Sequence, residues 1–282
     1  MNVIPQSSPI YTTLNELAEN AQIVVFSGLP GIGKSLYINA FYALAKQHKR
    51  SITVVQWDQA RKAFETDDIL RRFPMGDGTV HNGFKLMAGE YIKNKILSWT
   101  KHANSADLLL IEAPLVGHRF IEIVEQSDIE ELEAALASEK CRIIVPIPSK
   151  EVRRKIEEAR AAQVDDNAKV WIGAKPSVLK MLWNMVYDIA IEFGAELEEQ
   201  ENPPYDPEVV EFVFSKVCKH RNFVPLHVDE VFEVPEQSEA ELHSLESEMP
   251  SKEEVNTYFN FVNERFDSDD QIDQYVNSWY WQ

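Results

Sequence analysis

The stretch GLPGIGKS, residues 28–35, follows directly on the apolar run IVVFS at residues 23–27. It matches the pattern G-x-x-x-x-G-K-[ST] at every fixed position. Glycines let a backbone curl until successive N–H groups point at one anion, and the lysine and serine add contacts to phosphate and Mg²⁺. The apolar run predicts a buried strand, and residues 35–48 predict a helix after the loop. Together these segments predict a phosphate-binding loop; a surface turn is the alternative.

Apolar segments continue to alternate with helical ones along the chain. Further strands are predicted at residues 51–57, 107–112, 141–147 and 223–228, and helices at 12–20, 59–65, 81–102, 117–126, 128–138, 150–162, 177–193 and 206–220. Strands that alternate with helices form mainly parallel sheets covered on both faces. The sequence therefore predicts an α/β fold with a mainly parallel, five-stranded sheet. Ligands of such sheets bind beyond the carboxyl ends of the strands, where the glycine loop, Asp58 and Glu112 are all expected.

Acidic residues are concentrated in the C-terminal part of the chain. The net charge is −18 over 282 residues, and residues 229–282 hold fifteen Asp and Glu against Lys252 and Arg265, which places −13 of the charge there. We therefore expect a nucleotide-binding domain over residues 1–228 and an acidic C-terminal extension over 229–282, with helices near 237–247 and 251–265. Because an acidic segment repels phosphate, nucleic acid is not an expected partner. The many aromatic residues of the extension predict that it docks onto its own core or onto a protein partner.

The composition argues against several other classes of protein. No apolar run reaches eighteen residues, so a membrane span is not expected. The first twenty residues lack the basic start and apolar core of a signal peptide. Cys141 and Cys218 lack the spacing of a zinc site. A reduced, cytoplasmic setting is the expectation.

The loop and this layout resemble the small P-loop kinases, the adenylate-kinase, uridine-kinase and zeta-toxin-like group, over roughly residues 20–230. The motif and the resemblance imply that ATP and Mg²⁺ bind at the loop. Lys34 is expected to reach the β and γ phosphates, and Ser35 to ligate Mg²⁺. The residues expected to contact the nucleotide are Gly28, Leu29, Pro30, Gly31, Ile32, Gly33, Lys34, Ser35 and Leu36.

Asp58 and Arg61 follow the second predicted strand. In zeta-toxin-like and related kinases an acid at this place, often with an arginine three residues on, contacts the acceptor. The resemblance therefore implies that Asp58 takes the acceptor's hydroxyl proton and that Arg61 holds the substrate. Positions 58 and 61 share one face of a helix, as that requires. The alternative is that Asp58 caps a helix and Arg61 is a surface residue.

Glu112 ends the third predicted strand after four apolar residues, as carboxylates that support Mg²⁺ do. Uridine-kinase-like proteins often carry Glu followed by Gly there, whereas Ala113 follows in this chain. Glu112 is expected to support the Mg²⁺ or to contact the acceptor. A strand-end carboxylate without a ligand is the alternative.

Kinases of this group carry a lid after the fourth strand, so residues 150–175 are expected to form a helical lid. Arg153 and Arg160 are candidates for the cations that neutralise the transferred phosphoryl group when a lid closes. The segment is equally typical of a solvated helix held by Glu–Arg pairs.

Two further residues are candidates for contacts to the acceptor. His81 stands at the start of the long predicted helix, and Arg119, which follows the third predicted strand, could contact the acceptor or a phosphate. A single histidine is also a common structural residue, which is the alternative for His81.

These features predict an ATP-dependent phosphotransferase that moves the γ-phosphoryl group to a small hydroxyl-bearing acceptor, such as a nucleoside, nucleotide or sugar. The alternative is a nucleotide-dependent ATPase or switch that acts through a protein partner, with the acidic extension as the interface. The sequence contains no N-K-x-D guanine signature, so ATP is the expected nucleotide.

Overall fold

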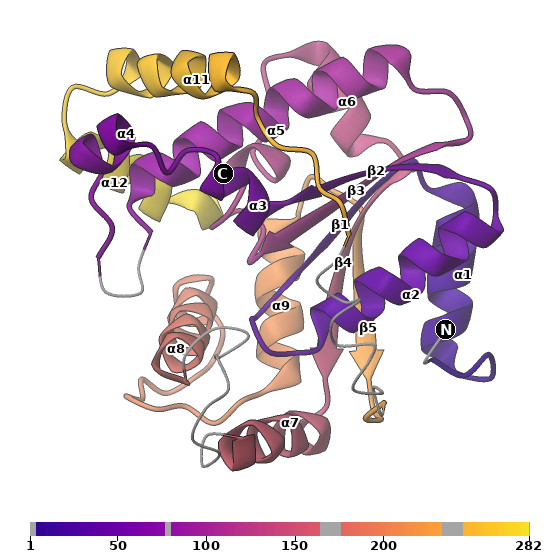
Figure 1. Cartoon of the computed structure of the whole chain (residues 1–282). Helices are drawn as coiled ribbons and strands as arrows, with labels where there is room; N and C mark the ends of the chain where they lie inside the picture. Colours follow the sequence, from indigo (N-terminus) through magenta and orange to yellow (C-terminus); the bar gives the residue numbers. More distant parts are fainter. Residues whose placement is uncertain (1–3, 77–79, 164–175, 233–244, 282) are drawn as a thin grey trace.

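The computed structural model describes residues 4–76, 80–163, 176–232 and 245–281. They form an α/β fold around one sheet of five parallel strands (Figure 1). The strand order is β2-β3-β1-β4-β5, and every neighbouring pair is parallel. The strands are β1 (Ile23–Gly28), β2 (Ser51–Gln56), β3 (Asp107–Pro114), β4 (Cys141–Pro148) and β5 (Phe223–Val228). The predicted fold class and the five-stranded sheet are confirmed.

The central strand β1 is buried along its whole length, which explains the apolar run at residues 23–26. Successive side chains of a strand point to opposite faces. Val24 and Phe26 accordingly belong to one hydrophobic cluster, and Ile23 and Val25 to another. Both faces of the sheet are therefore covered.

Two helices cover the face that Val24 and Phe26 reach, α1 (Pro9–Asn20) and α2 (Lys34–Gln47). The larger cluster on the other face includes residues of the helices α3, α4, α5, α6, α8, α9, α11 and α12. Their bounds are α3 (Trp57–Lys62), α4 (Asp67–Arg72), α5 (Asn82–His102), α6 (Glu130–Ala137), α8 (Pro176–Glu192), α9 (Pro207–Val217), α11 (Lys252–Arg265) and α12 (Asp269–Asn277). Helix α7 (Lys150–Gln163) follows β4, and short 3₁₀ helices lie at η1 (Ile121–Ile123) and η2 (Trp279–Trp281).

Arg50 ties the amino-terminal edge of the sheet together. Its side chain is buried, and its three guanidinium nitrogens donate to main-chain carbonyls at 2.6–3.1 Å. The accepting residues are Ala18, Glu19, Ala21, Ala106 and Asp107. One charged side chain thus joins the end of α1 to the starts of β1 and β3.

The helix predicted over residues 117–126 is wrong. Residues 115–120 form a loop in which Leu115, Gly117 and Phe120 have φ angles of 52°, 93° and 57°, and only the short η1 follows. Left-handed residues cannot continue a right-handed helix. The other predicted helices within residues 1–228 are present, with shifted ends, and α4 was not predicted.

The C-terminal extension docks on its own core, which is the first of the two alternatives drawn from the sequence. Helices α11 and α12 pack against α5, and both lie beside it in Figure 1. The buried side chains that they and η2 add to the larger cluster are Val255, Tyr258, Val262, Ile272, Val276 and Trp279. Of the helix predicted near 237–247, residues 237–244 lie outside the described residues, and 245–247 are not helical.

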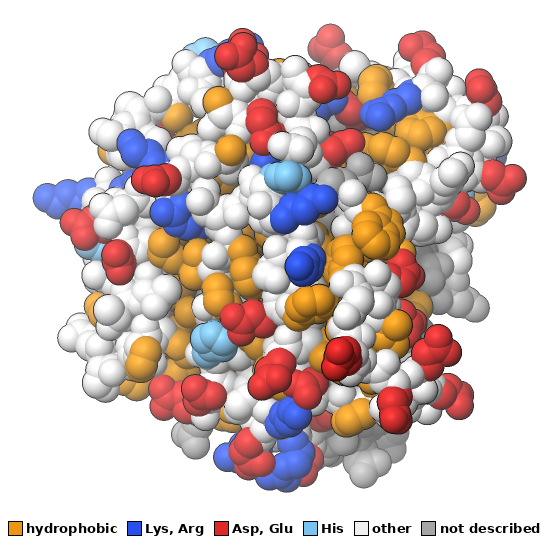
Figure 2. All heavy atoms as spheres, turned by 180° about the vertical axis from the view of Figure 1, so that it is seen from behind, with side chains coloured by type: hydrophobic (Ala, Val, Ile, Leu, Met, Phe, Trp, Pro, Cys, Tyr) orange, Lys and Arg blue, Asp and Glu red, His pale blue; other side chains and the backbone are white. Residues whose placement is uncertain are grey.

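The surface carries its charge unevenly. Figure 2 shows the side of the molecule opposite to Figure 1, with Asp and Glu side chains around much of the margin and a few Lys, Arg and His side chains near the middle. In the part of the chain that the structure describes, no helix combines the length and apolarity needed to cross a bilayer.

Candidate functional site

The glycine loop lies between the carboxyl end of β1 and the start of α2, as the sequence predicts. Gly28, Gly31 and Gly33 have φ angles of 127°, 80° and 79°, which residues with a Cβ rarely adopt. A Cβ on Gly28 would also lie 2.8 Å from Cδ1 of Ile32. Helix α2 begins with Gly33 as its N-cap, and this residue has no side chain to accept from the first N–H groups. The uncapped start of α2 can therefore serve as an anion site.

Lys34 and Glu112 meet beneath this loop. The Lys34 side chain is buried, and its Nζ donates to the Gly28 carbonyl oxygen at 3.3 Å and lies 3.9 Å from Oε1 of Glu112. Glu112 lies opposite Phe26 in the register of β1 and β3. Burial raises the pKa of Glu112, the Lys34 charge opposes this rise, and the Asp58 charge adds to it. A cation between Glu112 and Asp58 would relieve the repulsion of the two carboxylates.

Asp58 lies at the same edge of the sheet. It is the second residue of α3, two residues after Gln56, which is opposite Glu112 in the register of β2 and β3. Its side chain is 68% exposed, and its Oδ1 lies 4.0 Å from Nε of Arg61. Arg61 also pairs with Glu65. The structure therefore brings Asp58 and Arg61 to one side of the glycine loop and Glu112.

Arg119 contacts Trp57 and His118, neither of which was predicted as a site residue. Its guanidinium is 5.3 Å from the centre of the Trp57 ring, and its Nη1 is 2.9 Å from Nδ1 of His118. On the other side of that imidazole, Nζ of Lys85 is 2.8 Å from Nε2 of His118. Lys85 is buried within α5. The sequence did contain a sign that Lys85 is unusual, because this lysine stands between Phe84 and Leu86 in an otherwise apolar stretch.

The pKa values of Lys85, Arg119 and His118 are all lowered from their ordinary values. Burial, with the nearby Arg119 charge, lowers the pKa of Lys85 to about 6, although Asp273 opposes this change. Burial lowers the pKa of Arg119 to about 10 against the opposing charge of Asp58. Burial, together with the charges of Arg119 and Lys85, lowers the pKa of His118 well below its usual value.

His81 has contacts that explain it as a structural residue. Its Nδ1 accepts from the Gly83 N–H at 3.0 Å at the N-cap of α5, and its ring stacks on Phe73 with centroids 4.9 Å apart. Its Nε2 lies 3.9 Å from Asp269 of α12. These contacts favour the structural alternative for His81.

The lid arginines are described only in part. Arg153 is buried, donates through Nε to Glu157 at 2.7 Å, and lies over the Tyr205 ring at 5.4 Å. Among the described residues its Nη1 has no hydrogen-bond partner. The side chain of Arg160 and residues 164–175 lie outside the described part of the chain. Lid closure therefore stays a prediction.

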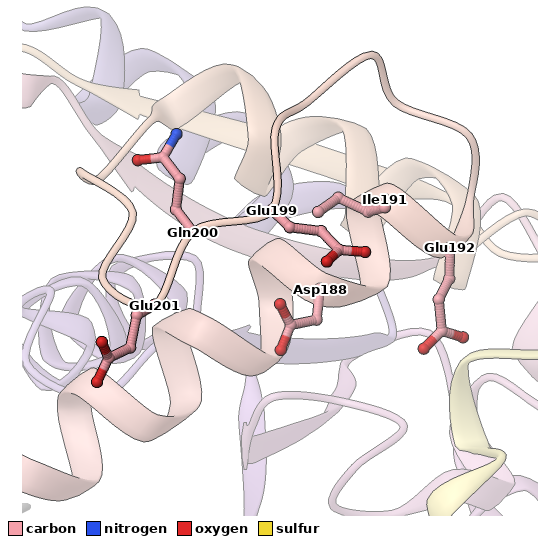
Figure 3. Close-up of a pocket in the computed structure, with 6 residues that line it drawn as sticks. All are labelled: Asp188, Ile191, Glu192, Glu199, Gln200 and Glu201. Atoms are coloured by element: carbon pink, nitrogen blue, oxygen red, sulfur yellow. The ribbon is translucent and has the colours of Figure 1, made fainter.

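A separate pocket of about 640 Å³ lies between α8 and the segment after it (Figure 3). Carboxylates dominate its lining, which would repel phosphate. The lining residues are Asp188, Ile191, Glu192, Glu199, Gln200 and Glu201. None of them is a predicted site residue, so this pocket is not the candidate nucleotide site.

Comparison with known proteins gives no guide to this site. No protein-family model matches the chain, and no curated protein matches its sequence. Function must therefore be inferred from the site itself.

Proposed function

We propose that the protein is an ATP-dependent phosphotransferase that moves the γ-phosphoryl group of ATP to a small hydroxyl-bearing acceptor. The observation that carries the proposal is a complete phosphate-binding sequence at the carboxyl end of the central strand, with two carboxylates, Glu112 and Asp58, at the same edge. In the strand order, the connection after β1 runs toward β2 at one edge of the sheet. The connection after β3 runs in the opposite direction, to β4. Ligands of open α/β sheets bind where neighbouring strands diverge in this way.

The residues around the loop suit a triphosphate and Mg²⁺. The main-chain N–H groups within residues 28–36, of which Pro30 has none, would hold the phosphates, with Lys34 at the β and γ groups. The Ser35 hydroxyl and the Glu112 carboxylate are hard oxygen donors of the kind that Mg²⁺ binds together with substrate phosphates. No cluster of three His, Cys, Asp or Glu side chains suited to a metal occurs in the described residues, and a Mg²⁺ shared with phosphates needs fewer protein ligands. When bound, the ion would supply positive charge to the β and γ phosphates.

Asp58 would act as the base for the acceptor. The acceptor oxygen forms a bond to the γ phosphorus, the bond from that phosphorus to the β–γ bridging oxygen breaks, and ADP leaves. The hydroxyl proton passes to the Asp58 carboxylate. Arg61, 4.0 Å from this carboxylate, would orient it and the substrate. The exposure of Asp58 leaves room for an acceptor to approach.

The test uses Lys34→Ala and Asp58→Asn in an assay for acceptor-stimulated ADP formation from a mixture of metabolites. Lys34→Ala should lose transfer because it removes the positive charge expected at the β and γ phosphates. Asp58→Asn should lose transfer because a positioned base contributes roughly 10²–10⁴-fold to the rate. Asp58→Asn should still bind Mg²⁺–ATP with near wild-type affinity in calorimetry. The matched control is Asp68→Asn, an exposed aspartate in the first turn of α4, which should leave transfer unchanged. Unchanged turnover in Asp58→Asn would remove the assigned base.

The exposure of Asp58 also favours a second candidate function, ATP hydrolysis. An exposed carboxylate near the γ phosphate can orient water as readily as a hydroxyl. Phosphate release that is equal with and without metabolites, and that a protein partner raises, would support an ATPase or switch.

A further inference from the structure

Arg119 is a partly buried cation without a close carboxylate. Within the described residues it forms no ion pair, and its side chain donates to the ring and to the carbonyl oxygen of His118. Asp58 attracts it only from a greater distance. A buried charge that lacks a partner destabilises a protein. A ligand anion would supply the missing charge.

The hydrogen bonds fix the protonation of its neighbours. A guanidinium has only donors, so Nδ1 of His118 must accept from Arg119. His118 is then neutral with its proton on Nε2, and this N–H points at Nζ of Lys85 at 2.8 Å. Nζ must accept, which requires the unprotonated amine. Lys85 is therefore held as a neutral amine, which agrees with its lowered pKa of about 6.

The chain holds this group firmly beside the glycine loop. The Val116 N–H donates to Oγ of Ser27 at 2.7 Å, which joins the loop after β3 to the end of β1. Gly117 lies so close to Trp279 that a Cβ would be 2.5 Å from Cε3 of that ring. The Trp279 ring also lies 5.8 Å from His118. The C-terminal extension therefore forms one wall of the group.

We propose that Arg119 and Lys85 recognise an anionic group of the acceptor, a carboxylate or a phosphate, and that Lys85 gains a proton when this anion binds, which releases the Nε2–H of His118 to donate to the anion as well. The assignment of this anion to the acceptor rests on the proposed function, whereas the prediction that an anion binds here is independent of it. The titratable groups that face Lys85 are Arg119 and the neutral His118 from the loop after β3 and Asp273 from α12. An anion adds negative charge to this set, so it favours protonated Lys85.

Sulfate is a suitable probe because its charge does not change between pH 6 and 8.5. Sulfate would be titrated calorimetrically into protein saturated with Mg²⁺ and a non-hydrolysable ATP analogue. Arg119→Met should weaken sulfate binding by at least about tenfold, the typical value of a charge-assisted hydrogen bond. Arg119→Lys should restore part of it. The control Arg71→Met removes an exposed arginine of α4 and should have no effect. Equal affinity in the wild type and Arg119→Met would overturn the proposal.

The proton supplies a second readout. Sulfate affinity of the wild type should fall as the pH rises above about 6, by up to tenfold per unit, because Lys85 must then take up a proton. Titration in two buffers of different ionisation enthalpy should show this uptake directly. Lys85→Met should bind sulfate more weakly and without this pH dependence. Wild-type affinity that is constant over this range would refute the proton step.

Failure of the proposed function would be recognised separately. If the protein does not bind the ATP analogue, the sulfate titration is made on Lys34→Ala without nucleotide, with and without Arg119→Met. Sulfate binding that depends on Arg119 there supports the anion site, and its absence overturns it. Circular dichroism and urea unfolding of each variant identify any that does not fold.

Discussion

Replacing Lys85 by methionine should stabilise the fold at neutral pH. The pKa of Lys85 falls from 10.5 to about 6 on folding, so at pH 7 the unfolded chain carries a proton that the folded chain must lose. Each pH unit between 7 and 10.5 corresponds to about 1.4 kcal/mol, which gives an upper limit of about 5 kcal/mol. The variant also loses the hydrogen bond to His118, which reduces the expected stabilisation by about 1 kcal/mol. The net stabilisation expected for Lys85→Met is therefore on the order of 2–4 kcal/mol at pH 7.

The pH dependence of the stability difference shows whether Lys85→Met acts by removing a titrating amine or only by improving the packing. Between pH 6 and 10.5 the unfolded chain holds more protons than the folded chain, so the contribution of Lys85 makes the wild type more stable as pH rises. The advantage of Lys85→Met should therefore shrink from pH 7 to pH 10, by up to about 1.4 kcal/mol per unit. Urea unfolding at pH 7, 8 and 9 measures it, with Lys101→Met, at the exposed end of α5, as the control. A difference that does not vary with pH, or a less stable variant, would refute the reasoning.

Three other substitutions test separate parts of the structure. Gly117→Val should destabilise the fold by at least about 2 kcal/mol, because the new side chain meets Trp279 at a left-handed position; an unchanged unfolding midpoint and unshifted tryptophan fluorescence would contradict this. Burial raises the pKa of Glu122 to about 8, so wild-type stability should fall from pH 4.5 to 8, and Glu122→Gln should gain roughly 2–4 kcal/mol over that window. Equal pH profiles in urea unfolding would count against it. Arg50→Lys should lose about 2–4 kcal/mol because an ammonium cannot reach five carbonyls, and an unchanged midpoint would show that these bonds contribute little.

The strands could be predicted from the sequence because their signal is local. A strand buried on both faces contains an unbroken apolar run, as at residues 23–26 of β1 and 108–111 of β3, and β5 was predicted with its observed bounds. The glycine loop was equally predictable, since a fixed spacing of residues specifies its backbone. The strand order was not predicted, because it depends on pairings between distant segments.

The remaining site features depend on residues far away in the chain. A helix was predicted over residues 117–126, which overlaps the loop at 115–120, because the sequence does not reveal that Trp279 packs on Gly117. Lys85 was overlooked because its neutral state results from burial and from Arg119 rather than from its neighbours in sequence. Asp58 and Glu112 were predicted to share an edge, and the strand register places them there.

The contact between Trp279 and Gly117 also bears on how the molecule is made. A ribosome releases the glycine loop early in synthesis and Trp279 only after the whole sheet has emerged. The nascent chain therefore contains its glycine loop and all five strands before the wall beside His118 exists.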